Sequence, residues 1–258
     1  MKEVSYRPLI EGMKWSYSRL TSFEDCPYRW FLKYICKETE KPQFYSSYGT
    51  LMHKLIEQYY RGKLSKDEML TQFLLNFSKE VQGERPSDTI VQKYITSGVD
   101  YLRNFKAFPF EMVDVEKRID FDVHGVPFVG VIDYIGTKNG ELYIIDNKSR
   151  DLKPRSKRKK PTVKDGELDE MLRQLYLYSA AVKQVYGMLP KALCFNCFKT
   201  GVFIEEPFDP EAYEGVIKWT VDLINEIADT EEFYPSIEYF KCRYICGVRE
   251  ECCYCDGM

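Results

Sequence analysis

The stretch that decides the fold is GVIDYIGTKNGELYIIDNK, residues 130–148. Its two apolar runs meet at Asn139-Gly140, a pair favoured in a tight type I′ turn, and so predict an antiparallel hairpin. In the second run, Asp146 and Lys148 share one face of the strand with aliphatic residues. A carboxylate on a half-buried face costs free energy, and Lys148 compensates only part of it. A bound divalent cation would compensate the rest of this cost.

A second carboxylate, Asp133, lies in the first strand of this hairpin. Pairing of the two strands would bring Asp133 and Asp146 to one end of the hairpin. Converging carboxylates suit Mg²⁺ or Mn²⁺, which prefer oxygen ligands and retain water for a phosphate. Lys148 could then position or deprotonate an attacking water, or stabilise charge on phosphorus. The alternative is a surface salt bridge at the strand ends.

Length and composition indicate a globular protein. The chain has 258 residues, of which 44% are hydrophobic, enough for a sizeable core. It contains no apolar run of the about 18 residues that a membrane span needs, and its start lacks the apolar core of a secretory signal. We therefore expect a cytoplasmic protein without a membrane partner, in the host cytoplasm if it is viral. The net charge of -3 restricts any polyanion site to a local patch.

The spacing of apolar residues changes along the chain. Recurrence every three or four positions predicts helices over 16–37 (broken at Cys26-Pro27), from about Tyr48, over 65–81, 89–105, from the Leu168 region to Tyr186, and over 210–228. Alternation predicts strands from Met112 and over 127–135, 141–147, 191–199 and 202–207. This order predicts an α/β fold with a central mixed sheet flanked by helices.

Five motifs, in order, resemble the PD-(D/E)XK nuclease superfamily and its RecB-like branch. They are SYSRLTSFEDCPYRWFLKYI (16–35), YGTLMH (48–53), GVIDYIG (130–136), LYIIDNKS (142–149) and QLYLY (174–178). Ile132 precedes Asp133 where the superfamily name has proline, a common variation. The resemblance implies a restriction-endonuclease-like core in one domain over 1–258. Its expected parts are an N-terminal helical part (16–110), a catalytic sheet and helix (111–208), and a C-terminal helix with a cysteine cluster (209–258).

The resemblance also implies an active site. The implied ligands of Mg²⁺ or Mn²⁺ are His53, Asp133, Asp146 and the carbonyl of Asn147. The implied catalytic residues are Asp133, Asp146, Lys148, Gln174 and Tyr178. From the residues alone, His53 could equally be a surface histidine bonded to Glu57, one helical turn on. His124, beside Gly125 in a turn, is interpreted as structural.

Three further residues near this site have two interpretations each. Gln174 and Tyr178, one helical turn apart, are implied by the resemblance to hold the active-site loop or a phosphate. Their pattern also fits an amphipathic helix with Tyr178 in the core. Glu116 is a further acidic candidate, for which an ion pair with Lys117 or Arg118 at the strand edge is the favoured interpretation.

Nine cysteines point to metal or redox chemistry rather than disulfides. Those near the two ends resemble the iron-sulfur version of these nucleases, in which four thiolates hold a 4Fe-4S cluster. The implied ligands are Cys26, Cys242, Cys246 and Cys252, with Cys253 or Cys255 as alternatives. The gap from Cys242 to Cys246 is one residue longer than usual, so the fourth ligand stays open. A structural zinc ion held by four cysteines is the runner-up.

A basic loop follows the second strand of the hairpin directly. Its cations are predicted to neutralise DNA phosphates: Arg150, Lys153, Arg155, Lys157, Arg158, Lys159 and Lys160. We expect a metal-dependent DNA exonuclease, with or without endonuclease activity, acting on DNA with a free end or a single strand. The resemblance suggests recombination, repair, or phage or CRISPR DNA processing. The alternative is a non-catalytic DNA-binding or assembly module, which Asp133, Asp146 and Lys148 together disfavour.

Overall fold

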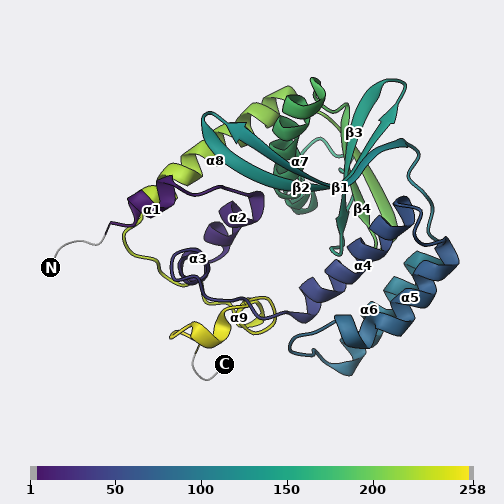
Figure 1. Ribbon diagram of the computed structural model, residues 1–258, viewed down its shortest axis with the longest axis horizontal. Coiled ribbons are helices and arrows are strands. Elements are labelled where there is room, and N and C mark those ends of the chain that lie inside the picture. Colours follow the sequence, from purple (N-terminus) through teal and green to yellow (C-terminus); the bar gives the residue numbers. More distant parts are fainter. Residues whose placement is uncertain (1–4, 256–258) are drawn as a thin grey trace.

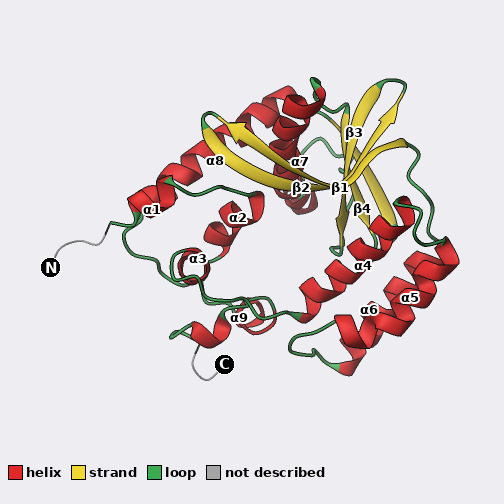
Figure 2. Ribbon diagram, in the orientation of Figure 1, coloured by secondary structure: helices red, strands yellow, loops and turns green. Residues whose placement is uncertain are grey.

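The structure, a computed structural model that describes residues 5–255, is built on a five-stranded mixed sheet in the order β1-β2-β3-β4-β5 (Figures 1 and 2). The strands are β1 (Glu111–Val123), β2 (Val126–Lys138), β3 (Glu141–Lys148), β4 (Ala192–Cys197) and β5 (Val202–Pro207). Strands β3 and β4 are parallel, because helix α7 (Val163–Tyr186) connects them, and the other neighbours are antiparallel. The predicted α/β class with a mixed sheet is confirmed.

The first three strands form an antiparallel meander that contains the predicted hairpin. Asn139 and Gly140 both have positive φ, 55° and 79°, as a two-residue type I′ turn requires. His124 and Gly125, with φ of 51° and 85°, make the corresponding turn between β1 and β2. Both turns thus join their strands without a long loop.

All predicted helices are present, but two of them begin earlier than expected, and two short helices near the ends of the described range were not predicted. Besides α7, the described helices are α1 (Arg7–Glu11), α2 (Tyr17–Asp25), α3 (Pro27–Tyr34), α4 (Phe44–Tyr60), α5 (Lys66–Glu80), α6 (Asp88–Arg103), α8 (Pro210–Asp229) and α9 (Tyr239–Tyr244). The break at Cys26 is confirmed. Helix α4 begins at Phe44, not near Tyr48, because buried Phe44 adds a turn. Within residues 5–255, no helix is long and apolar enough to cross a membrane.

The start of α7 was predicted too late, near Leu168. The helix begins at Val163 because Thr162 and Asp165 form a capping box. Each side chain satisfies a backbone N–H group at the helix start. These polar residues extend the helix beyond its apolar stripe.

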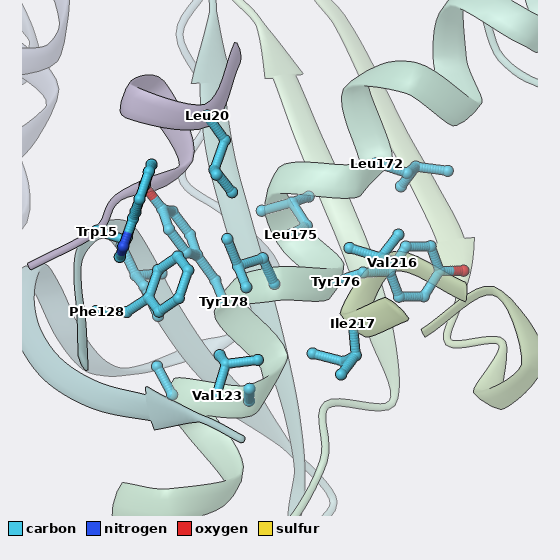
Figure 3. Close-up of a cluster of buried hydrophobic side chains, with 14 of the residues drawn as sticks. Trp15, Leu20, Val123, Phe128, Leu172, Leu175, Tyr176, Tyr178, Val216 and Ile217 are labelled. Carbon is cyan, nitrogen blue, oxygen red and sulfur yellow. The ribbon is translucent and has the colours of Figure 1, made fainter. Parts of the chain in front are cut away.

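One face of the sheet is covered by α7 and α8, and α2 and α3 extend the same core (Figure 1). Ile144 of β3 belongs to this core. Figure 3 shows Leu175 and Tyr178 of α7 beside Trp15 and Phe128, which come from the N-terminal segment and β2. This face therefore packs the helix carrying the QLYLY motif onto the strands that carry the carboxylates.

On the other side of the molecule, α4, α5 and α6 form a helical arm with its own core (Figure 1). Tyr60, at the end of α4, packs against Tyr134 of β2, with 4.7 Å between ring centroids. Phe198, just after β4, is buried among the side chains of the arm. These contacts fix α4 against the sheet and bring its middle turns to the end of the β2–β3 hairpin.

The packing of α5 on α6 depends on a glycine. A Cβ atom at Gly98 would lie 2.4 Å from Cζ of the buried Phe73. We expect Gly98→Ala to lower the free energy of unfolding by about 1–3 kcal/mol through overpacking, as measured by urea denaturation. Gly215 of α8 has no neighbouring atom within 4 Å of such a Cβ. Gly215→Ala, the matched control, should raise the free energy of unfolding by about 0.5–1 kcal/mol. A stabilised Gly98→Ala protein would contradict the prediction.

Candidate active site

The two carboxylates of the hairpin lie where its ladder ends. The β2–β3 pairing stops at Tyr134 and Ile145, so Asp133 and Asp146 are the next residues beyond it. Oδ2 of Asp133 accepts a hydrogen bond from the backbone N–H of Asn147 at 2.7 Å. This bond satisfies a buried backbone donor that the ladder no longer serves. The predicted approach of the two carboxylates is therefore observed.

Helix α4 brings His53 to the same point. Nδ1 of His53 lies 3.3 Å from Oδ2 of Asp133, and Nε2 lies 2.9 Å from the carbonyl oxygen of Asn147. Burial alone would lower the pKa of His53, but Asp133, together with Glu116, raises it well above 6.5. Glu57, the alternative partner, pairs with Arg61 instead. His53 thus joins the carboxylates across the boundary between the helical arm and the sheet.

Glu116 faces this site, which corrects the favoured interpretation of its sequence context. Its Oε1 lies 3.7 Å from Nδ1 of His53. Lys117 pairs with Asp114 at 3.3 Å and not with Glu116. Arg118 forms no ion pair with Glu116 within residues 5–255.

A local distortion of β1 accompanies this orientation. Glu116 has φ of 47°, in the left-handed region that costs a non-glycine residue about 1–3 kcal/mol. Arg61 of α4 donates a hydrogen bond to the carbonyl of Val115 at 3.1 Å, next to the distortion. The β1–β2 register places Glu116 opposite Asp133. No residue type near Glu116 signals such a backbone, so sequence alone could not reveal this position.

The side chains of His53, Glu116 and Asp133 form a donor set for a divalent cation. One ligand atom from each lies within 4.8 Å of the others. The carbonyl of Asn147, 2.9 Å from Nε2 of His53, adds a neutral oxygen. One imidazole nitrogen with several oxygens suits Mg²⁺ or Mn²⁺.

Asp146 belongs to an adjoining ion pair on the α7 side. Its carboxylate, only 4% exposed, lies 2.8 Å from Nζ of Lys148, which also donates to Oε1 of Gln174 at 2.7 Å. Oδ2 of Asp146 is buried and has the Lys148 ammonium as its ion-pair partner, which leaves it capacity to accept a second contact. Burial raises the pKa of Asp146 to about 6. The positive charge of Lys148 opposes this increase, and the negative charge of Asp133 adds to it. A buried carboxylate oxygen with remaining acceptor capacity, next to Asp133, fits a bound cation.

Gln174 of α7 lies next to Lys148, and Tyr178, one turn on, is in the core, as the amphipathic-helix interpretation predicts. Nε2 of Gln174 donates to the hydroxyl of Tyr178 at 3.4 Å, so the pair continues the chain that begins at Lys148. Tyr178 is also a core residue, and a Cβ at Gly130 would lie 2.8 Å from its ring. Gly130 in the hairpin motif thus permits the close approach of α7.

Asn196 is a neighbour of the site that the sequence did not reveal. It is the parallel partner of Asn147 across β3 and β4. Its Nδ2 donates to Oδ1 of Asn147 at 2.6 Å and to the hydroxyl of Tyr101 at 2.7 Å. These bonds connect the side chain of Asn147 to α6 through Asn196. The pairing was hidden because α7 separates the two strands in sequence.

The C-terminal segment that contains α9 lies next to α3 (Figure 1), and four of its cysteines form a cluster there. Cys242, Cys252 and Cys255 are buried against Leu32 and Val248, and Cys246 packs beside them. Burial raises the pKa of Cys246, and Cys26 and Cys252 add to this effect. Burial, Cys252 and Cys242 raise the pKa of Cys255 to about 12. A cationic group would offset this cost of ionising neighbouring thiols.

Cys26 and Cys253 lie differently. Sγ of Cys26 caps α3 and accepts the backbone N–H groups of Arg29 and Ser236, each at 3.4 Å. Cys253 is exposed, with its sulfur 3.4 Å from the hydroxyl of Tyr28. Of the two alternative thiols, Cys255 therefore lies inside the cysteine group and Cys253 outside it. Cys194 and Cys197 are buried in β4, away from this group.

The segment bearing these cysteines is attached to the helical arm. Glu84, in the loop between α5 and α6, pairs with Arg243 at 2.6 Å and Arg249 at 2.7 Å. The backbone N–H of Lys41 donates to the carbonyl of Gly247 at 2.8 Å. The cysteine segment thus contacts the arm that carries His53.

The basic loop contains cations of two kinds. Arg155 forms ion pairs with Glu206 at 2.7 Å and Asp169 at 2.6 Å, and Lys153 pairs with Asp151 at 2.9 Å. The others have no ion pair with any residue of the described range: Arg150, Lys157, Arg158, Lys159 and Lys160. The predicted DNA-binding set therefore divides into paired and free cations.

Comparison with known proteins agrees with this fold. The family model of the PD-(D/E)XK nuclease superfamily matches residues 14–253. A solved structure named "Putative exonuclease", from Eubacterium rectale, is 14% identical, with 98% of this chain and 90% of that chain covered and a TM-score of 0.53. That likeness concerns the fold alone. A structure named SSO0001 is 15% identical over 91% of this chain and 96% of that chain, but its TM-score of 0.29 supports no inference. No curated protein sequence matches the chain.

Proposed function

The chain belongs to the PD-(D/E)XK nuclease superfamily, and we propose that it is a metal-dependent exonuclease that hydrolyses phosphodiester bonds of DNA. The observation that carries the proposal is the convergence of His53, Glu116 and Asp133 on one point, beside the buried Asp146–Lys148 pair. Three separate elements, α4, β1 and β2, contribute to this point. A surface salt bridge would require neither the burial nor the strained backbone at Glu116.

In this proposal, each polar side chain has a role. His53, Asp133, Asp146 and the Asn147 carbonyl hold the cation, and Glu116 joins them. A bound divalent cation supplies Lewis-acid polarisation of the phosphodiester. Lys148, oriented by Gln174 at 2.7 Å, presents its ammonium group to the charge that develops on phosphorus. Tyr178 holds Gln174 in turn.

DNA as substrate and exonucleolytic cleavage are the finer parts of the proposal. They are supported by the family, by the motifs in order and by the name of the Eubacterium rectale protein. The test uses single- and double-stranded DNA, labelled at either end, with Mg²⁺ or Mn²⁺. Mononucleotides released from one labelled end support an exonuclease, whereas internal fragments indicate an endonuclease. Binding of DNA without any cleavage would favour the non-catalytic module.

Cation affinity is expected to rise with pH. Nearby carboxylates raise the pKa of His53 well above 6.5, which favours the doubly protonated, cationic form of its ring in the metal-free protein. A cation that binds through His53 must displace one of these ring protons, so affinity should increase about tenfold per pH unit for each proton released. Calorimetric titration with Mn²⁺ at pH 6 and pH 8 measures this change.

The two histidines provide the control for this titration. His124→Gln, in the turn between β1 and β2, should retain the pH dependence, whereas His53→Gln should lose most of it. Equal affinity of the wild-type protein for Mn²⁺ at both pH values would show that cation binding does not displace a proton from His53.

We also propose that a 4Fe-4S cluster joins the two ends of the chain. The support is the gathering of Cys242, Cys246, Cys252 and Cys255 near Cys26, since thiolates alone hold such clusters. With Cys26, Cys242 and Cys246 as three ligands, the fourth would be either Cys252 or Cys255, both buried. Zinc is the alternative, because tetrahedral thiolate sites also bind zinc.

Anaerobic purification distinguishes the two metals. A broad visible absorbance band, with about four irons per chain, is expected for the cluster. Cys242→Ser should abolish the band, whereas Cys253→Ser should leave it unchanged. Zinc without iron in the purified protein would show that these cysteines bind zinc and not an iron-sulfur cluster.

A further inference from the structure

The loop between β3 and α7 is attached to the body of the protein at defined points. Leu152 is 4% exposed and belongs to the main core. Arg155, two residues before the densest basic run, is held by Glu206 of β5 and Asp169 of α7. The first half of the loop is therefore packed and paired.

A buried carboxylate closes the second half. Asp165, in the first turn of α7, is 2% exposed. It accepts the backbone N–H of Ser156 at 2.6 Å and its hydroxyl at 2.7 Å. It also accepts the backbone N–H of Thr162 at 2.6 Å and its hydroxyl at 2.8 Å. These four bonds join the two sides of the loop at its base.

The residues between Ser156 and Thr162 contain four consecutive cations, Lys157, Arg158, Lys159 and Lys160, which we call the basic tip. All four are exposed, and none has an ion pair with a residue at positions 5–255. Like charges held together repel one another, and closure of the loop prevents them from spreading. The chain as a whole has a net charge of -3, so this concentration is local.

An arrangement of this kind is suited to a polyanion. Several cations that contact successive phosphates release counterions, which favours binding. A loop already closed at its base loses less conformational freedom on binding than an open one. Arg155 differs, because its guanidinium group is already occupied by two carboxylates.

We propose that the basic tip is the loop's contact surface for the phosphate backbone of nucleic acid, and that Asp165 is its positioning residue. The choice of nucleic acid as the polyanion rests on the proposed nuclease function. Within the loop, Arg155 instead maintains the fold. Asp165 acts through the tip and touches no phosphate itself.

The test measures binding separately from cleavage. Fluorescence anisotropy of a labelled single-stranded oligonucleotide is recorded between 50 and 200 mM salt with Asp146→Asn protein, which limits cleavage. Replacing the four tip cations with glutamine should reduce the salt dependence, the slope of log affinity against log salt, by about 3, at about 0.7 per phosphate contact on single strands. The charge-matched control replaces exposed Lys63, Lys66, Lys79 and Lys138 and should leave most of the slope.

Two further variants test positioning. Asp165→Asn should weaken binding about threefold to tenfold with little change in slope, because the charges remain but the loop opens. Ser156→Ala removes one of the four bonds without altering the α7 cap and should have a smaller effect of the same kind. In the protein with the glutamine tip, Asp165→Asn should have no further effect on binding, whereas a general loss of structure would lower affinity again.

The outcomes separate this inference from the proposed function. An unchanged slope in the glutamine-tip protein overturns the role of the tip, even if the wild-type enzyme cleaves DNA. A reduced slope in the glutamine-tip protein, together with no cleavage by the wild-type protein, supports the binding role of the basic tip and contradicts the nuclease assignment. An additive effect of Asp165→Asn in the glutamine-tip protein overturns the positioning role.

Discussion

Replacing Asp146 with asparagine is expected to lower the rate of DNA cleavage by about a thousandfold. The carboxylate is buried, has remaining acceptor capacity at Oδ2 and holds Lys148 at 2.8 Å. Asparagine keeps the shape but loses the charge that both the cation and Lys148 require. Lys148→Ala should lower the rate by about a hundredfold, because only the charge facing phosphorus is removed. Single-turnover assays on end-labelled DNA measure both.

The control is another aspartate in a paired strand. Asp120 of β1 pairs with Lys14 at 3.3 Å on the exposed surface. Asp120→Asn should leave the cleavage rate within about twofold, since exposed ion pairs contribute little. Cleavage that survives both Asp146→Asn and Lys148→Ala would reject the assigned site. Mn²⁺ titration of Asp146→Asn, expected to show weakened binding, separates loss of the cation from loss of Lys148 alignment.

The largest effect on stability is expected at Trp30. Its side chain is 0% exposed and contacts the rings of Trp15, Phe23, Tyr34 and Phe233 at centroid distances of 5.6–6.4 Å. Trp30→Ala would leave a cavity where the N-terminal helices meet the segment after α8. We expect a loss of about 3–5 kcal/mol in the free energy of unfolding, measured by urea denaturation.

Trp219 of α8 is the matched control. It is half-buried, donates to Glu24 at 3.0 Å and lies under the guanidinium group of Arg173 at 4.5 Å. Trp219→Ala should cost about 1 kcal/mol, because one cation–π contact and an exposed hydrogen bond are lost. Equal losses for the two tryptophans would show that the cluster around Trp30 is not a central part of the core.

Local sequence was sufficient for most elements of the fold. Alternation of apolar residues and the Asn139-Gly140 turn determined the meander, and the break at Cys26 followed from Pro27. Errors occurred where buried or capping residues lay outside the apolar stripe, as at Phe44 and Thr162. Periodicity reports which face is buried, whereas helix ends depend on single polar contacts.

The site was predictable only in part, because its contacts join residues that no local pattern relates. The position of His53 beside Asp133 came from a resemblance, since no local rule relates α4 to the hairpin. Glu116 was assigned to an ion pair because its neighbours in sequence are cations, but a left-handed backbone turns it toward His53. Asn196 reaches Asn147 only through parallel pairing across α7.

The sequence by itself determined the α/β class, the hairpin 130–148 and the Asp146–Lys148 pair, because each depends on residues close together in the chain. Tertiary structure alone decided that Glu116 joins the donor set and that Arg155 is withdrawn into ion pairs while Asp165 closes the basic tip. These contacts join residues from different elements. Their formation depends on packing and backbone geometry, which the local pattern of side chains does not encode.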